Sequence, residues 1–165
     1  MPTARRALAT AIDYTAMAVP LGALAAITLL RHRNRPLPDV SPAKARVLVA
    51  AGLTLPLSAA LAAAEATGGS PGKRALGLTV RDESGADPTY RQTLLRTVAK
   101  TAVPWELGHQ AVWEFRADNT RRGAVLASAA YVALGLQAAA ILRNRRTYAD
   151  KLAGTRVESS HGSSN

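Results

Sequence analysis

Asp13 is the residue whose surroundings in the sequence most directly suggest chemistry. It is the single charged residue in three apolar runs, residues 7–30, 47–64 and 123–142. An ionisable side chain inside such a run usually faces the interior of a helix bundle, because a carboxylate that faces lipid costs about 2.5 kcal/mol or more. Two interpretations follow. Asp13 either binds a cation or a proton, or forms a structural pair that holds its helix against a basic neighbour.

Arg6 precedes Asp13 by seven residues, so both side chains lie on nearly the same face of a helix. At 1.5 Å per residue they are about 10.5 Å apart along the helix axis, which is too far to expect a direct ion pair. In the ion-site interpretation, Arg6 tunes the charge state of Asp13 from this distance.

Glu106 and His109 have the i, i+3 spacing that places two metal ligands on one helix face. Bundle metal sites need two such pairs and further glutamates, whereas this chain has one pair, with Glu114 nearby. We therefore favour a polar interfacial cluster over a metal site, and expect no metal and no cofactor. Lys73 and Arg74 complete this set of secondary polar residues.

The apolar runs themselves predict membrane helices. The mean hydropathy of +0.01 averages these runs with the other 103 residues, which hold 31 of the 32 charged side chains. As helices, the runs reach about 36, 27 and 30 Å, against a hydrocarbon core of about 30 Å. A soluble alanine-rich bundle is the alternative, but leucine and valine in all three runs, with isoleucine in the first and third, favour the membrane. Asp13, and the absence of a polar cleavage region before Arg31, disfavour a cleaved signal peptide.

Residues 89–115 fit two arrangements. Leucines and valines recur at helical spacing in the first half, with Arg96 and Lys100 on other faces, which predicts an amphipathic helix at the membrane surface. The second half is apolar and carries Trp105 and Trp113, so the segment could instead cross as a third span of four. With four spans and a cytoplasmic N-terminus, eleven lysines and arginines lie on the cytoplasmic side and eight on the outer side. With three spans, the numbers are eleven on one side and ten on the other. The count favours four.

The polar connections predict a small insert outside the bilayer. Residues 31–46 are basic and contain three prolines, which predicts an irregular loop. Residues 76–80 have the composition of a strand, and residues 82–85 that of a turn. Residues 154–157 have the chemistry to pair with the strand. Such pairing requires both segments on one side of the membrane, and hence an even number of spans between them.

Composition excludes several other classes of protein. The chain has no cysteine, which excludes disulfide frameworks, thiolate metal sites and cysteine nucleophiles. Its seven aromatic residues are too few, and its arginines too dispersed, for a nucleic-acid-binding surface. Nothing arranges a serine nucleophile with a base, so we expect no enzyme. The excess of arginine and alanine is typical of a GC-rich bacterial source.

Three segments together resemble the RDD family of small membrane proteins, named for an arginine and two aspartates. They are residues 6–13, residues 70–82 followed by 94–96, and residues 146–157. The resemblance implies that Arg6, Asp13 and Asp150 are the defining polar residues. It also implies a role in transport, with cation/proton exchange linked to some members. Ala149 is a departure, because the family often has histidine just before the second aspartate.

These observations predict an all-α membrane protein with about four hydrophobic helices, a small cytoplasmic β-like insert and both termini in the cytoplasm. Residues 1–157 would form one RDD-like transmembrane domain, and residues 158–165 a disordered polar tail.

The first functional hypothesis is transport of a cation, a proton or a small ligand. Asp13 would bind the ion, and Asp150 would pair with a basic residue such as Lys73 or Arg74 to close the cytoplasmic side. The alternative is a non-catalytic membrane assembly or regulatory subunit with structural ion pairs. We expect anionic lipids as partners. We also expect a second copy of the chain or another membrane protein, because four short helices can scarcely enclose a transport pathway alone.

Overall fold

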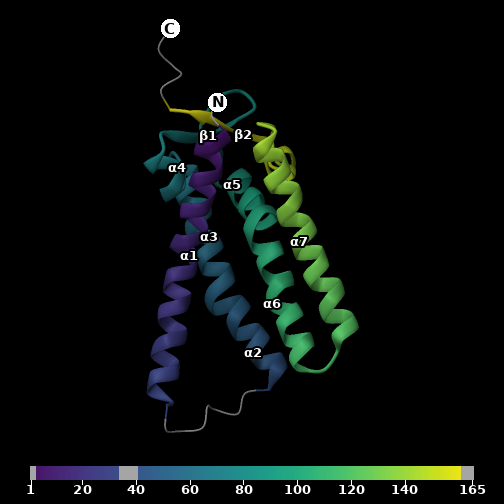
Figure 1. Cartoon of the computed structure of the whole chain (residues 1–165). Coiled ribbons are helices and arrows are strands. Elements are labelled where there is room, and N and C mark those ends of the chain that lie inside the picture. The colour runs from purple at the N-terminus through teal and green to yellow at the C-terminus, as the bar shows by residue number, and fades with distance from the viewer. Residues whose placement is uncertain (1–2, 34–40, 161–165) are drawn as a thin grey trace.

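The computed structural model describes residues 3–33 and 41–160 and is mostly helical (Figure 1). Helix α1 (Thr3–Arg31) runs the full length of the molecule. Helix α2 (Pro42–Val49), the π-helix η1 (Ala50–Thr54) and α3 (Leu55–Ala66) follow one another without a break and form a second rod. Helix α5 (Tyr90–Thr97), the π-helix η2 (Val98–Ala102) and α6 (Val103–Arg116) form a third rod. It packs along α7 (Thr120–Leu142) as a hairpin.

Two helical segments among the described residues are long and apolar enough to cross a membrane, Ala43–Ala75 and Thr120–Leu142. They contain the second and third apolar runs of the sequence. The first run lies within α1. The loop predicted over residues 31–46 is too long at its far end, because α2 already begins at Pro42. Ser41 accepts a hydrogen bond from the backbone N–H of Lys44, and proline is well suited to a first helical turn. Residues 34–40 of that predicted loop lie outside the described residues.

Burial is inverted relative to a water-soluble protein. Among the described residues, 18 buried residues are polar or charged and 10 are hydrophobic, while 20 large hydrophobic side chains are exposed. The rod that begins with α5 illustrates this, because Arg96 and Lys100 are buried whereas Leu95 is 42% exposed. Polar side chains inside and apolar ones outside suit a protein surrounded by hydrocarbon.

Both interrupted rods place a proline directly after a π-helix. Pro56 and Pro104 are each the second residue of the helix that follows. Because proline has no N–H group, the carbonyl four residues earlier loses its usual donor. For Pro104 this carbonyl belongs to Lys100, and Gln137 Nε2 and Tyr14 OH donate to it over 2.8 and 3.4 Å. Side chains of α7 and α1 therefore satisfy the freed backbone group.

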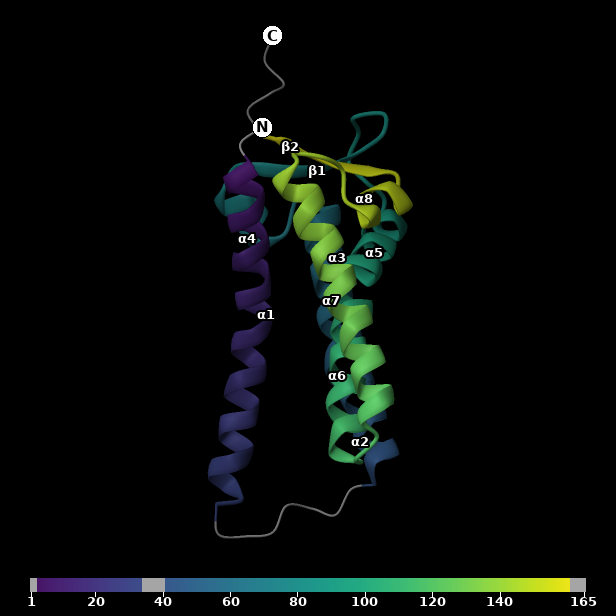
Figure 2. The ribbon, with the colours of Figure 1, turned by 45° about the vertical axis from the view of Figure 1, so that its right-hand side comes forward.

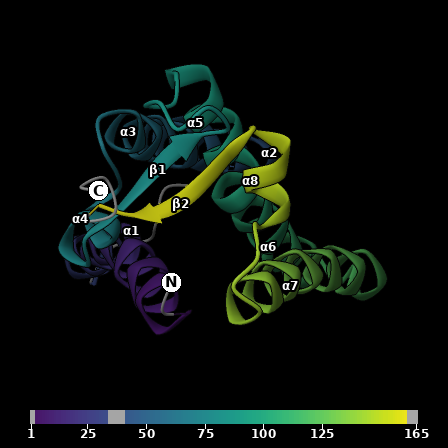
Figure 3. The ribbon, with the colours of Figure 1, turned by 90° about the horizontal axis from the view of Figure 1, so that it is seen from above.

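A strand pair lies across one end of the helices (Figures 2 and 3). Strand β1 (Leu78–Asp82) pairs antiparallel with β2 (Thr155–Ser159), with Val80 opposite Val157. The predicted pairing of the two segments is confirmed. The predicted turn is confirmed as well, because Asp82 Oδ1 accepts hydrogen bonds from Ser84 Oγ and Ala86 N over 2.7 and 2.9 Å.

Two short helices complete the end of the molecule that carries the strands, α4 (Pro71–Ala75) and α8 (Tyr148–Leu152). We call α4, β1, α8 and β2 together the cap. The C-terminal end of α1, the start of α2 and the turn from α6 to α7 lie at the opposite end (Figure 1). Strand β2 runs through Ser159, so regular structure extends two residues into the segment predicted as a tail. Residues 161–165 of that tail lie outside the described residues.

Candidate functional site

Asp13 lies on the inner face of α1, where its carboxylate meets the start of α4. Ser70 Oγ donates to Asp13 Oδ2 over 2.6 Å, and the backbone N–H of Gly72 donates to Oδ1 over 2.8 Å. Lys73 Nζ lies 3.5 Å from Oδ2. Asp13 is 4% exposed, and donors from one short segment of the same chain satisfy its carboxylate. This contact fastens α1 to the cap.

Gly72 allows that contact, because α4 touches the backbone of α1 at this residue. A Cβ atom at position 72 would lie 2.2 Å from the carbonyl oxygen of Ala9 and 3.0 Å from Asp13 Oδ1. The nearest atom is backbone and cannot turn aside as a flexible side chain would. Only glycine fits here without moving α4 away from α1.

Lys73 extends the charged contacts from α4 to α3. Its ammonium forms a salt bridge with Glu65 Oε1 and donates to Ser70 Oγ over 2.8 Å. Glu65 lies near the C-terminal end of α3 and is 1% exposed. A carboxylate at this depth needs a cation beside it, since an unpaired buried charge is costly. Lys73 thus connects two carboxylates that come from α1 and α3.

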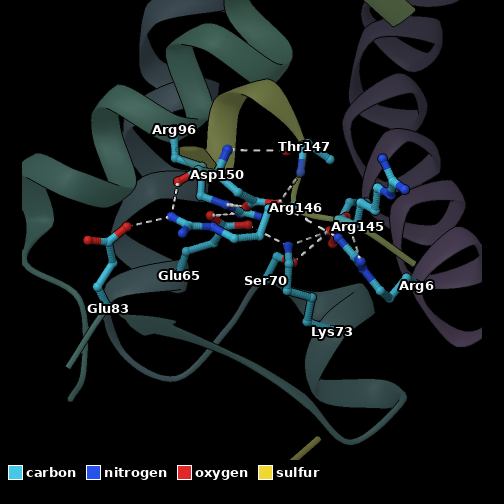
Figure 4. A network of polar contacts seen from close by, with 11 residues as sticks. Arg6, Glu65, Ser70, Lys73, Glu83, Arg96, Arg145, Arg146, Thr147 and Asp150 are labelled. Carbon is cyan, nitrogen blue, oxygen red and sulfur yellow. Dashed lines mark hydrogen bonds and ion pairs between the residues drawn. The ribbon is translucent and has the colours of Figure 1, made fainter. Parts of the chain in front are cut away.

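Arg96 makes the next connection, from α3 to α8 (Figure 4). Its Nε donates to Asp150 Oδ1 over 2.6 Å, and its Nη1 pairs with Glu65 Oε2. The side chain is fully buried. A guanidinium presents its N–H groups in fixed directions, so one arginine can hold two carboxylates at once.

Asp150 belongs to the cap and is fully buried. Its Oδ2 accepts from the backbone N–H of Thr147 over 3.0 Å, and Thr147 Oγ1 accepts from Asp150 N over 3.1 Å, a capping box for α8. Arg6 Nη2 lies 3.7 Å from the same Oδ2. Burial alone would raise the pKa of Asp150, but Arg96 and the Thr147 hydrogen bonds hold it below its ordinary value.

We call these residues the ion network: Arg6, Asp13, Glu65, Lys73, Arg96 and Asp150. It joins α1, α3, α4, α5 and α8 directly beneath the strand pair. Its carboxylates all accept from donors of the same chain. The arrangement can therefore hold distant segments together, and an ion could reach these carboxylates only by displacing the present donors.

The sequence model of the RDD family matches residues 2–154 of the chain. The chain belongs to the RDD family. This is a membrane-associated family, and the match confirms the resemblance found in the sequence. Comparisons with curated proteins and with solved structures find no match.

The structure places Arg6, Asp13 and Asp150, the three residues that the resemblance singled out, in one ion network of this RDD protein. Arg6 pairs with Asp150 and also donates to the carbonyl oxygen of Arg145 over 2.9 Å, in keeping with the expectation that Arg6 and Asp13 are too far apart for a direct ion pair. Asp150 pairs with basic residues, but these are Arg96 and Arg6 and not Lys73 or Arg74. Asp150 is held by Arg96, which the amphipathic pattern placed on a different helix face from the leucines and valines.

Arg74 lies outside the ion network of the RDD protein. It is exposed, and its Nη2 donates to the carbonyl oxygen of Ala64 over 3.1 Å and to Thr67 Oγ1 over 2.9 Å. Arg74 therefore caps the C-terminal end of α3, where carbonyl groups lack helical donors. Its neighbour Lys73 points to the opposite side, into the network.

Glu106 and His109 are not brought to Lys73 and Arg74, because they lie in α6, outside the cap. Glu106 accepts a hydrogen bond from Thr54 Oγ1 of η1, and the ring of His109 packs edge-on against Trp105 at 4.9 Å between centroids. The secondary polar cluster predicted from the sequence therefore does not form. Within the described ranges, no group of three acidic or histidine residues could hold a metal ion.

Sequence reasoning missed Glu65, Arg96 and Lys100 as site residues. Glu65 directly follows the second apolar run, so it reads as the polar end of a span. Arg96 and Lys100 are four residues apart and therefore share one helix face with Thr93 and Thr97. That polar stripe is the signal that could have found them. In a membrane protein such a face turns inward, as it does here.

Proposed function

We propose that this RDD protein crosses the membrane four times, with both termini and the cap in the cytoplasm. The pairing of β1 with β2 supports an even number of crossings between them, and the hairpin of α5–η2–α6 with α7 supplies two. About 27 residues from Tyr90 to Arg116 span roughly 40 Å as a helix, enough for the hydrocarbon core. The polar face of this rod is buried within the bundle, as a third span requires.

A cysteine-free chain allows a direct test of this topology. Ala86→Cys lies in the turn of the cap and Ala117→Cys in the turn after α6, and both alanines are exposed. We expect a membrane-impermeant maleimide to label Ala117→Cys in intact cells, and Ala86→Cys only after the membrane is permeabilised. Labelling of both variants from the same side would contradict four spans and favour a surface helix over residues 89–115.

We infer further that the protein is a non-catalytic membrane subunit with an assembly or regulatory function. The observation that carries this proposal is the saturation of Asp13, Glu65 and Asp150 by donors of the same chain. An ion site would leave part of a carboxylate open to its ligand, whereas these carboxylates hold α1, α3 and the cap in one arrangement. Such a fixed unit suits a structural scaffold better than a pathway for ion transport.

The outer surface of α1 supports an association with a second copy or with another membrane protein. Leu8, Val19 and Leu30 are between 52% and 71% exposed on this helix. Below the cap, α1 stands apart from α7 (Figure 2), and an apolar cavity of about 430 Å³ lies between Tyr14 of α1 and the α6–α7 hairpin. Exposed arginines at the cap end, such as Arg143, are suited to anionic lipid headgroups.

A cross-linking experiment tests self-association. Val19→Cys places a thiol on the exposed surface of α1, and Ala62→Cys is the control because Ala62 is fully buried. We expect oxidation in native membranes to produce a covalent dimer of the first variant alone. Without a dimer, the partner would be a different protein, to be sought by purifying the tagged chain from mild detergent. A monomer without partners would contradict the proposal.

Transport of a cation or a proton is the rival function, and one comparison separates the two. Asp13→Asn removes the carboxylate, whereas Gly72→Ala keeps every charge and only forces α4 away from α1. For a subunit, both variants lower the amount of folded protein, and the surviving protein shows no change of sodium, potassium or proton flux in vesicles. Normal folding of Asp13→Asn with loss of a flux that the wild type supports would establish transport instead.

A further inference from the structure

Lys100 is a buried cation outside the pairs of the ion network. It lies in η2 and is 7% exposed. Its backbone carbonyl accepts from Gln137 and Tyr14, but its ammonium forms no salt bridge or hydrogen bond with any residue that the structure describes. Arg6, by contrast, has a carboxylate oxygen within 3.7 Å. The proposed subunit function gives Lys100 no role.

The charges around Lys100 do not balance. The ion network contains three carboxylates, on Asp13, Glu65 and Asp150, and three cations, on Arg6, Lys73 and Arg96. A protonated Lys100 adds a fourth cation to these three carboxylates and three cations, whose charges already balance. An uncompensated charge in a region that excludes water is strongly unfavourable, so it must be neutralised by a partner or by loss of its proton.

A small cavity lies where a partner would be needed. Its volume is about 20 Å³, and all four cations line it. Leu78 of β1 and Val157 of β2 line the same space, which therefore lies just beneath the strand pair. Asp150 also lines it, but its oxygens are already held by Arg96, Thr147 and Arg6. A cavity of this size has room for one water-sized species.

We propose that a monovalent inorganic anion of the size of chloride binds in this cavity and neutralises Lys100. One negative charge balances the surplus of one cation. The Lys100 ammonium supplies a donor that makes no salt bridge with the described residues, and Arg6, Lys73 and Arg96 surround the space with positive potential. Phosphate and sulfate are larger than the single water-sized species for which the cavity has room, and their second charge would exceed the surplus. The anion completes the ion network.

Halide dependence of stability tests this site in the full-length protein. The wild type is purified in detergent with sodium gluconate, and its thermal unfolding is followed through Trp105 and Trp113 while chloride or bromide replaces gluconate at constant sodium concentration. A ligand that binds the folded state alone raises the midpoint in a saturable manner. We expect a rise of about 3 °C or more with chloride or bromide, and none with sulfate at equal ionic strength.

Two variants test whether the stabilisation by halide arises at Lys100. Lys100→Met retains the length of the side chain without its charge, and should lose the halide response. Lys151→Met is the control, because Lys151 is an exposed cation of α8. It should respond as the wild type does. A halide response that persists in Lys100→Met would overturn the proposal.

Binding of chloride to the wild-type protein tests the anion site without any substitution. Equilibrium dialysis against radioactive chloride should give one bound chloride per chain. No bound chloride, or stability that does not depend on halide and increases as pH rises past the point where Lys100 loses its proton, would overturn the anion site. These results would leave the subunit proposal standing, because that proposal rests on the saturated carboxylates and not on Lys100.

Discussion

Replacing Arg96 offers the most direct measurement of what the ion network contributes to stability. The guanidinium holds Asp150 Oδ1 at 2.6 Å and also Glu65 Oε2, and it is 2% exposed. Removing one partner of a buried ion pair costs about 3–5 kcal/mol, because a charge is left uncompensated. Arg96→Met breaks two pairs, but each carboxylate keeps another cation, Lys73 for Glu65 and Arg6 for Asp150. We therefore expect a loss of about 4 kcal/mol.

Arg96→Lys separates the geometry of the side chain from its charge. A single ammonium lacks the fork that reaches both carboxylates, so it can hold one of them at the distances seen here. The expected loss is roughly half that of Arg96→Met, about 2 kcal/mol. A double variant in which Glu65 and Arg96 are both replaced by neutral residues should recover part of the loss, because Lys73 then keeps Asp13 as a partner and Asp150 keeps Arg6.

The assay is equilibrium unfolding of the purified chain in mixed micelles of mild detergent and dodecyl sulfate, followed by circular dichroism. Glu83→Gln is the matched control. It breaks the salt bridge of Glu83 with Arg146, which joins a carboxylate 66% exposed to a guanidinium 36% exposed. Exposed pairs contribute little, so its transition should overlay that of the wild type. If Arg96→Met were as mild as Glu83→Gln, the stabilising role of the ion network would be refuted.

Three further predictions concern the contacts around the network. Gly72→Ala should lower the free energy of unfolding in the same assay by about 2 kcal/mol or more, because its Cβ overlaps the Ala9 carbonyl; an unchanged transition would contradict the close contact of α4 with α1. Asp150, whose pKa is lowered on folding, contributes stability that is complete above its unfolded pKa of about 4 and is lost as pH falls through the folded value. Unfolding between pH 6 and 2 should therefore show a loss at acid pH that Asp150→Asn reduces. Gln137→Leu removes the 2.8 Å donor to the freed Lys100 carbonyl and should cost about 1 kcal/mol or more, whereas Tyr131→Phe, at a residue 74% exposed, should cost nothing measurable.

The sequence predicted the parts of this fold that depend on local composition. The apolar runs lie in helices, and the strands and turn of the cap lie where residues 76–85 and 154–157 indicated. The pairing of the two strands could be predicted because both segments have the composition of strands, with β-branched residues in each. The start of α2 was missed, since three prolines favoured a loop although one of them begins the helix.

The partners of the charged residues could not be predicted to the same extent. Asp13 was singled out correctly as an inward-facing residue, because hydrocarbon makes any other direction costly. Its donors come from Ser70 and Gly72, which show no charge in the sequence to mark them. Arg96 was not recognised as a partner of a carboxylate, because the amphipathic pattern of its segment was interpreted as that of a helix at the membrane surface. Which cation meets which carboxylate depends on packing between residues up to 144 positions apart, and no spacing rule reaches that far.

The contact between Arg6 and Asp150 has a consequence for how the chain is made. Arg6 leaves the ribosome 144 residues before its carboxylate partner, an interval of about 7–29 s at ordinary rates of synthesis. Strand β1 likewise waits for β2. During that interval the Arg6 guanidinium lacks its carboxylate. Synthesis of the segment that carries Asp150 therefore completes the ion network, and chains truncated before Asp150 would leave both Arg6 and Arg96 without this carboxylate.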